Sequence, residues 1–133
     1  MEGVVLNNLN LKQGHCLELK GLLAKDAKGF CVNLGKDPSN IVIHFNPRFD
    51  QHGDSNVIVC NSKEADAWGT EQRSTSFPFT LGNENTVCFE HQGDKLKIKL
   101  SNGEDFTFPI RMAADSISFL SLEGIELKSL ALH

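Results

Sequence analysis

Short segments in which apolar and polar residues alternate are the feature that most constrains this chain. Residues 95–100 alternate three lysines with Leu96, Ile98 and Leu100, and residues 16–22 show the same period of two. Successive side chains of a β-strand point to opposite faces, so this pattern predicts strands with one buried and one solvated face. No helical stripe accompanies these segments. The sequence therefore predicts an all-β fold.

Turn residues separate the predicted strands at close and regular intervals. Strands are predicted at residues 16–22, 30–34, 41–49, 55–61, 71–73, 86–90, 95–100, 106–110, 117–122 and 125–132. Loops are predicted at residues 35–40 and 50–54, and a polar connection at residues 62–67. About ten short strands at this spacing are typical of a β-sandwich of two antiparallel sheets.

The strand predicted at residues 41–49 has two different faces. Its apolar face carries Ile43, Phe45 and Phe49, and its polar face carries His44, Asn46 and Arg48. Asparagine is disfavoured in strands, so three hydrogen-bonding residues at alternate positions indicate a binding site rather than an ordinary solvated face. Pro47 lacks a backbone donor, and we expect the strand to be bulged or open there.

Length and charge narrow the class of protein. The 133 residues suffice for one domain, which we expect to cover residues 1–133. The net charge of −4 argues against binding to the phosphate backbone of a nucleic acid.

No signal peptide is visible and no segment could span a bilayer, so the cytosol is the expected compartment. There, we expect buried or half-buried thiols rather than disulfides at Cys16, Cys31, Cys60 and Cys88.

A dense group of hydrogen-bonding side chains surrounds the chain's only tryptophan. The group consists of His44, Asn46, Arg48, His52, Asp54, Asn61, Trp68, Glu71 and Arg73. Planar polar groups can each present two hydrogen-bonding atoms to the hydroxyls of a neutral sugar, and a rigid aromatic ring can cover the apolar face of the sugar ring. A sole tryptophan is usually a core residue, but the residues around Trp68 do not alternate into a buried face. We therefore expect an exposed aromatic platform.

Zinc binding is one alternative for this group. His44 and His52, together with Asp54 and Glu71, are potential ligands. The two histidines are eight positions apart across a turn, outside the usual ligand spacings, so we expect no metal.

Glycoside hydrolysis is a second alternative. It needs two carboxyl groups, one of which has a raised pKa, and Glu71 and Asp54 are available. The neighbouring Arg48 and Arg73 are expected to lower the pKa of both carboxyls instead. Binding without catalysis is the simpler interpretation, and we do not expect an enzyme.

Three motifs in this region are specific in combination: HFNPR at residues 44–48, NVIVCN at 56–61 and WGTEQR at 68–73. With them the chain resembles the galectins, in particular their single-domain, dimeric members, and the resemblance covers nearly the whole chain. It implies a jelly-roll-like β-sandwich that binds β-galactosides such as lactose and N-acetyllactosamine without a metal, a cofactor or catalysis.

The resemblance also implies roles for the site residues. His44, Asn46 and Arg48 would bond the axial 4-hydroxyl that distinguishes galactose from glucose. Trp68 would stack on the apolar face of galactose.

The 6-hydroxyl of galactose would be held by Asn61 and Glu71. The 3-hydroxyl of the adjoining glucose or N-acetylglucosamine would be reached by Arg48 and Glu71. Supporting or extended contacts are implied for Arg73, His52 and Asp54.

The implied partners are glycans on glycoproteins and glycolipids, cross-linked by a bivalent homodimer. Apolar residues suited to a dimer interface, unless they only fill the core, are Val4, Val5, Leu6, Ile125, Leu127 and Leu130. Galectins also reach the cell surface without a signal peptide, which implies both cytoplasmic and extracellular locations. The alternative from another class is a sandwich that binds protein partners independently of sugar.

Overall fold

The computed structural model describes residues 3–133; Met1 and Glu2, with which the expected domain begins, lie outside them. The larger sheet has the strand order β1-β13-β4-β5-β6-β7, and β8 also pairs with β6. Its strands are β1 (Val4–Leu6), β4 (Cys31–Asp37), β5 (Asn40–Arg48), β6 (Val57–Glu64), β7 (Ala67–Trp68), β8 (Gln72–Ser74) and β13 (Phe119–Glu123).

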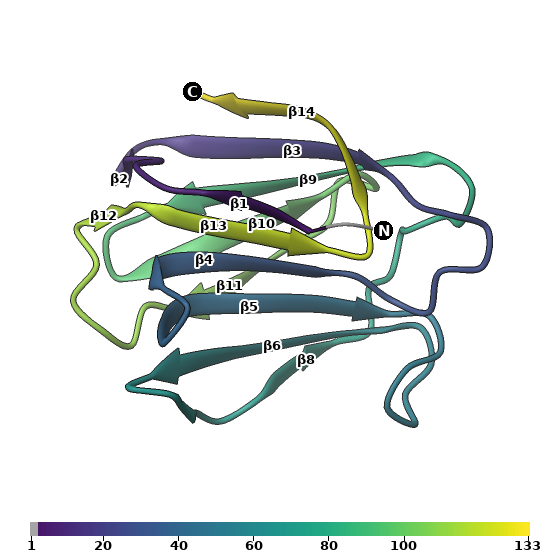
Figure 1. Cartoon of the computed structure of the whole chain (residues 1–133), viewed down its shortest axis with the longest axis horizontal. Coiled ribbons are helices and arrows are strands. Elements are labelled where there is room, and N and C mark those ends of the chain that lie inside the picture. Colours follow the sequence, from purple (N-terminus) through teal and green to yellow (C-terminus); the bar gives the residue numbers. More distant parts are fainter. Residues whose placement is uncertain (1–2) are drawn as a thin grey trace.

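The smaller sheet has the strand order β11-β10-β9-β3-β14. Its strands are β3 (Cys16–Leu22), β9 (Glu84–His91), β10 (Lys95–Leu100), β11 (Asp105–Pro109) and β14 (Glu126–Leu132). A separate ribbon pairs β2 (Leu11–Lys12) with β12 (Ser116–Ile117). Strands β9, β10 and β11 lie behind the larger sheet in Figure 1. This jelly-roll sandwich of antiparallel sheets confirms the predicted fold class.

The alternation of apolar and polar residues along the strands gives each sheet one apolar face, and the core lies between these two faces. Alternate residues of β3 and β10 are buried, so the three lysines of β10 cover a buried apolar face as expected. The Phe45 and Phe89 rings meet across the core edge to face, with centroids 5.3 Å apart. Phe79 is also buried and contacts the Phe30 ring. Across residues 3–133 no helix is long and apolar enough to cross a membrane.

Two predicted connections are wrong, because tight hairpins replace them. β4 continues to Asp37 and β5 begins at Asn40, where a loop at 35–40 was expected. Asp37 Oδ1 accepts hydrogen bonds from the Ser39 backbone N–H at 2.9 Å and from Asn40 Nδ2 at 3.0 Å, which fixes the short turn.

The predicted polar connection at residues 62–67 is the second of these hairpins. β6 extends to Glu64, and Ala65 and Asp66 both have positive φ angles, 49° and 66°, as a type I′ turn requires. The turn reverses the chain so that Trp68 pairs with Lys63.

Of the two alternatives expected at Pro47, bulged or open, the second holds. The pairs with β6 continue regularly past Pro47, with the register shift between Ile41 and His44, whereas the pairs with β4 end at Phe45. Pro47 faces the side where β4 has ended, and its carbonyl accepts from Phe30 N–H. The strand predicted at 117–122 is divided at Ser118, because β12 pairs with β2 and β13 pairs with β4.

The cysteines are buried or half-buried as predicted. Burial raises the pKa of Cys31 to about 11 and that of Cys60 to about 12. These two side chains therefore stay in the unreactive thiol form at neutral pH.

The edge strands β1 and β14 lie toward the same side of the sandwich (Figure 1). Val5 is 61% exposed there, and Leu127 and Leu130 are only partly buried. Ile125 does not belong to this edge surface. It is 2% exposed and is part of the core.

Candidate functional site

A shallow groove of about 210 Å³ lies on the face of the larger sheet that points away from the core. Its lining consists of His44, Arg48, Val59, Asn61, Trp68 and Glu71. The strand register explains this grouping, because His44 of β5 lies directly opposite Asn61 of β6. Residues far apart in the sequence thus come together, and five of the nine predicted site residues line one groove.

Trp68 is exposed, as the local sequence indicated. The residue is 52% exposed. The His44 ring meets it edge to face, with centroids 5.0 Å apart, and Lys63 Nζ lies 4.9 Å from the centre of the indole. These contacts hold the ring in place while leaving much of it open to a ligand.

His44 is fixed in one protonation state and one tautomer. Burial, together with the charges of Arg48 and Lys63, lowers its pKa from 6.5 to about 4, so the ring is neutral at pH 7. Its Nδ1 lies 2.6 Å from Asn33 Oδ1, while Asn33 Nδ2 donates to Ser121 Oγ at 3.0 Å. Because the amide oxygen of Asn33 faces the ring and can only accept, Nδ1 must donate. Nε2 then carries a lone pair that can accept a hydrogen bond from a hydroxyl.

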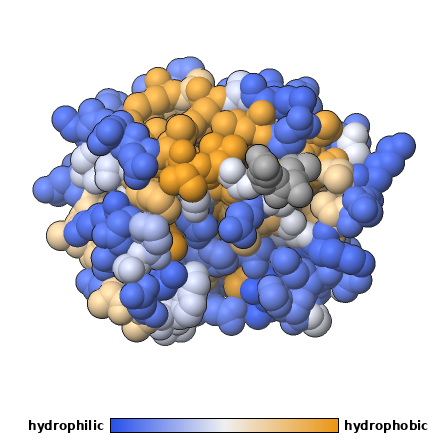
Figure 2. Space-filling view, viewed as in Figure 1, coloured by the Kyte–Doolittle hydropathy of each residue, from blue (hydrophilic) through white to orange (hydrophobic). Residues whose placement is uncertain are grey.

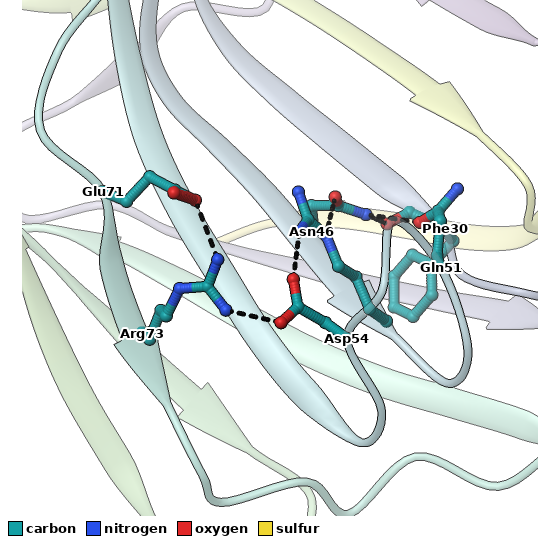
Figure 3. A network of polar contacts seen from close by, with 7 residues as sticks. Phe30, Asn46, Gln51, Asp54, Glu71 and Arg73 are labelled. Atoms are coloured by element: carbon teal, nitrogen blue, oxygen red, sulfur yellow. Dashed lines mark hydrogen bonds and ion pairs between the residues drawn. The ribbon is translucent and has the colours of Figure 1, made fainter.

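Arg48 is held by two neighbours, Asn46 and Asp54, which are labelled in Figure 3. Its Nε donates to Asn46 Oδ1 at 2.9 Å, and its Nη1 forms an ion pair with Asp54 Oδ2 at 2.6 Å. Asn46 is only 2% exposed, and its Nδ2 donates to the Phe30 carbonyl at 2.8 Å and to Gln51 Oε1 at 3.3 Å. Asn46 is therefore a buried anchor for Arg48.

The same network continues to Glu71 through Arg73 (Figure 3). Arg73 Nη1 lies 2.8 Å from Asp54 Oδ1, and its Nη2 lies 3.3 Å from Glu71 Oε2. The hydrogen bonds from Arg73 and Arg48 lower the pKa of Asp54, as expected from the sequence. Asp54 is thus ionised at neutral pH and does not provide the protonated carboxyl that a hydrolase needs.

The other four predicted site residues, Asn46, His52, Asp54 and Arg73, do not line the groove. Asp54 holds Arg48, and Arg73 holds Glu71, from behind. His52 is at the exposed tip of a turn closed by Gln51 and Asp54, with a φ angle of 53°. Its contact with a ligand stays a prediction.

Asn61 is 8% exposed and well anchored. Its Nδ2 donates to the Gly69 carbonyl at 3.1 Å, and its Oδ1 accepts from the Ser62 backbone N–H at 2.8 Å. One Nδ2 hydrogen is left for a ligand in the groove.

Several residues of the site did not emerge from the sequence. Val59 and Lys63 follow the same alternation as Asn61 along β6. Val59 lies within the strand predicted at 55–61 but carries no polar group that would mark it, and a longer predicted strand would have included Lys63. Asn33 and Arg111 reach the site only through tertiary contacts with His44 and with Asn61. No local pattern marks these two.

Two further observations concern alternative sites among the described residues. In the described part of the chain, His, Cys, Asp and Glu side chains form no cluster of three or more that could hold a metal ion. A second hollow of about 420 Å³ shares no residue with the groove. Its buried histidine, His91, is satisfied by the Ala114 carbonyl and the Gly93 N–H.

Comparison with known proteins relates this architecture to one family. The family model of galactoside-binding lectins matches residues 3–132. Galectin-1 of Rhinella arenarum is 61% identical over 128 residues, which are 96% of each chain. The toad ovary galectin in complex with thio-digalactose has a TM-score of 0.97 at 59% identity, covering 100% of this chain and 99% of that one.

A third similar protein is CG-16, a homodimeric agglutinin from chicken liver. Its structure has a TM-score of 0.94 at 41% identity and covers 99% of this chain and 100% of its own. The match to the family model over nearly the full length, the high identity to Galectin-1 and the shared sandwich agree. This chain therefore belongs to the galactoside-binding lectins, the galectin family.

Proposed function

We propose that this chain is a lectin that binds β-galactosides, such as lactose and N-acetyllactosamine, in the groove described above. The observation that supports this proposal most strongly is that the groove presents a fixed hydrogen-bond acceptor beside a fixed hydrogen-bond donor. His44 Nε2 accepts, and the Arg48 guanidinium donates. A sugar hydroxyl donates and accepts at once, so one hydroxyl can satisfy both groups.

The residue roles follow from this arrangement. The axial 4-hydroxyl of galactose bonds to His44, Asn46 and Arg48. Trp68 covers the apolar face of the same ring. The equatorial 4-hydroxyl of glucose points elsewhere and loses these bonds, which is the proposed basis of specificity.

The remaining hydroxyls meet the β6 and β8 side of the groove. The 6-hydroxyl bonds to Asn61 and Glu71, and Glu71 with Arg48 reaches the adjoining glucose or N-acetylglucosamine. The toad ovary galectin, captured with thio-digalactose, supports this class of ligand. Because the groove is shallow and wet, we expect a monovalent dissociation constant between about 1 mM and 1 μM.

Affinity chromatography tests the proposed function. The protein should be retained on immobilised lactose, eluted by free lactose and not eluted by sucrose. Failure to bind would favour the other class, a sandwich that acts through protein partners alone. Turnover of a nitrophenyl galactoside would contradict the non-catalytic assignment, which is supported by membership in a lectin family.

We also propose that function requires a homodimer that cross-links glycans on glycoproteins and glycolipids. An apolar patch covers the upper part of the molecule in Figure 2, toward the edge strands of Figure 1. Exposed or half-buried apolar residues near this edge are Val4, Val5, Leu6, Leu127, Leu130 and Leu132. The homodimeric agglutinin CG-16 supports this assembly.

A dimer that binds glycans at both of its sites gains avidity without any new contact to the sugar. Val5→Asp should therefore shift the protein toward the monomer in sedimentation velocity and abolish agglutination of glycan-bearing cells. Lactose affinity per site should stay unchanged. A monomeric wild type at working concentration would contradict the proposed dimer.

The proposed locations are the cytoplasm and, after export without a signal peptide, the cell exterior. Membership of the galectin family supports this proposal. Detection of the protein at the surface of intact expressing cells, released by lactose, tests it. A protein confined to cell lysates would contradict the extracellular location.

A further inference from the structure

Arg111 joins the two sheets at the groove. It follows β11, the edge strand of the smaller sheet, yet its guanidinium reaches β6 of the larger sheet. Its Nη1 donates to Ser62 Oγ at 3.0 Å and lies 3.5 Å from Asn61 Oδ1. The groove residue Asn61 is therefore contacted by the opposite layer of the sandwich.

The guanidinium is also fixed from its own side. Its central carbon lies 4.7 Å from the centre of the Phe108 ring, and Phe108 is fully buried. A cation over a buried aromatic face is oriented by the ring as well as by its hydrogen bonds. Arg111 is an exposed residue, yet these contacts at Ser62 and Phe108 hold its guanidinium in one place.

Arg111 adds a third contact to the two backbone contacts that orient the Asn61 amide. The Ser62 backbone N–H and Arg111 Nη1 both donate toward Asn61 Oδ1. The Gly69 carbonyl accepts from Asn61 Nδ2. If the amide turned over, its nitrogen would face a positive charge and its oxygen would face a carbonyl. The free Nδ2 hydrogen is thereby kept available to the groove.

The guanidinium also supports the backbone beside Trp68. A Cβ added at Gly69 would lie 3.0 Å from Arg111 Nη1 and 3.0 Å from Ser62 Oγ. The Gly69 N–H donates to the Ser62 carbonyl at 2.8 Å. Arg111 therefore packs closely against the residue that follows the aromatic platform.

We infer that Arg111 is a positioning residue of the sugar site, which orients Asn61 toward the 6-hydroxyl of galactose from behind the groove. This inference rests on the proposed function. Arg111 does not line the groove and acts through Asn61 rather than on the sugar. Its effect should therefore depend on the presence of the 6-hydroxyl.

Calorimetric titration of Arg111→Met with two ligands tests this dependence. The ligands are lactose and the lactose analogue that lacks the 6-hydroxyl on its galactose ring. The variant should bind lactose about three- to tenfold more weakly than wild type, the range expected for one misplaced hydrogen bond. The two proteins should bind the deoxy analogue equally.

Two further variants complete the test. Lys97→Met also removes one positive charge, but on the smaller sheet beside Asp105, and should bind both ligands as wild type does. Ser62→Ala removes the acceptor that lies 3.0 Å from Arg111 and should show the same ligand dependence as Arg111→Met. If Arg111→Met does not fold, the ligand dependence of Ser62→Ala tests the inference in its place.

Unchanged lactose affinity in Arg111→Met would overturn the inference, and so would an equal loss for both ligands. A matching loss in Lys97→Met would assign the effect to net charge and would also overturn it. Failure of the wild type to bind lactose would instead contradict the proposed function, so the two failures are distinguishable.

Discussion

His44 Nδ1 and Asn33 Oδ1 lie 2.6 Å apart on neighbouring strands, and this contact decides what the sugar site can recognise. Asn33 Oδ1 accepts the hydrogen bond from His44 Nδ1–H, so the free lone pair of the neutral imidazole is on Nε2 of this groove residue. A group that no sequence motif places beside His44 thus determines whether His44 accepts or donates.

Asn33→Ala should weaken lactose binding by about two- to tenfold, because the neutral ring would then populate both tautomers. Nitrogen chemical shifts of the His44 ring should show this mixture directly, and calorimetry should give the affinity. Asn83→Ala, at an exposed loop position, is the matched control and should behave as wild type. An unchanged tautomer in Asn33→Ala would refute the account of His44.

Lactose affinity should be constant from pH 7.5 to about pH 5.5 and should fall as the pH approaches 4, since sugar binding needs the neutral ring. The pKa of His44 is lowered from 6.5 to about 4 in the folded chain. Its contribution to folding stability is therefore complete above pH 6.5 and is lost as the pH falls through 4. Titrations followed by Trp68 fluorescence check this profile. A midpoint near 6.5 would contradict it.

Asn46→Ala should destabilise the fold by about 1–3 kcal/mol, because the buried Phe30 carbonyl loses its donor. The same change frees Arg48 Nε, so lactose affinity should fall as well. Urea unfolding at fixed protein concentration and calorimetry measure the two effects, again with Asn83→Ala as the control. Full stability in Asn46→Ala would show that the amide is not an anchor.

Trp68→Ala should abolish lactose binding while changing the free energy of unfolding by less than about 1 kcal/mol, because the side chain is largely exposed. Trp68→Phe keeps a smaller platform and should retain part of the affinity. Lactose retention of the alanine variant on the affinity column would count against stacking. A large loss of stability would show that the ring is part of the core.

The sequence predicts the fold class and most of the groove because period-two alternation is a local property. The polar face of β5 carries His44 and Arg48 at alternate positions, and β3 and β10 have the predicted bounds. The exposure of Trp68 could also be predicted from its neighbours, which lack the alternation of a buried strand.

Contacts between distant segments could not be predicted in this way. Asn33 and Arg111 lie 11 and 50 positions from the residues they orient, and their roles depend on strand register and on the packing of the two sheets. The same limit of sequence-based prediction applies to Ile125, which is part of the core. An apolar residue beside an edge strand can face the core or the exterior, and the sequence alone does not distinguish the two. The hairpin at Ala65 and Asp66 was missed because Ala-Asp is not one of the usual residue pairs of a type I′ turn.

Recognition of the axial 4-hydroxyl is the central claim, and calorimetric titration with lactose and cellobiose tests it most directly. The two disaccharides differ only in the configuration at that carbon of the non-reducing ring. We predict saturable binding of lactose, with a dissociation constant between about 1 mM and 1 μM, and no measurable binding of cellobiose. Equal binding of both sugars, or no binding of lactose, would contradict the account.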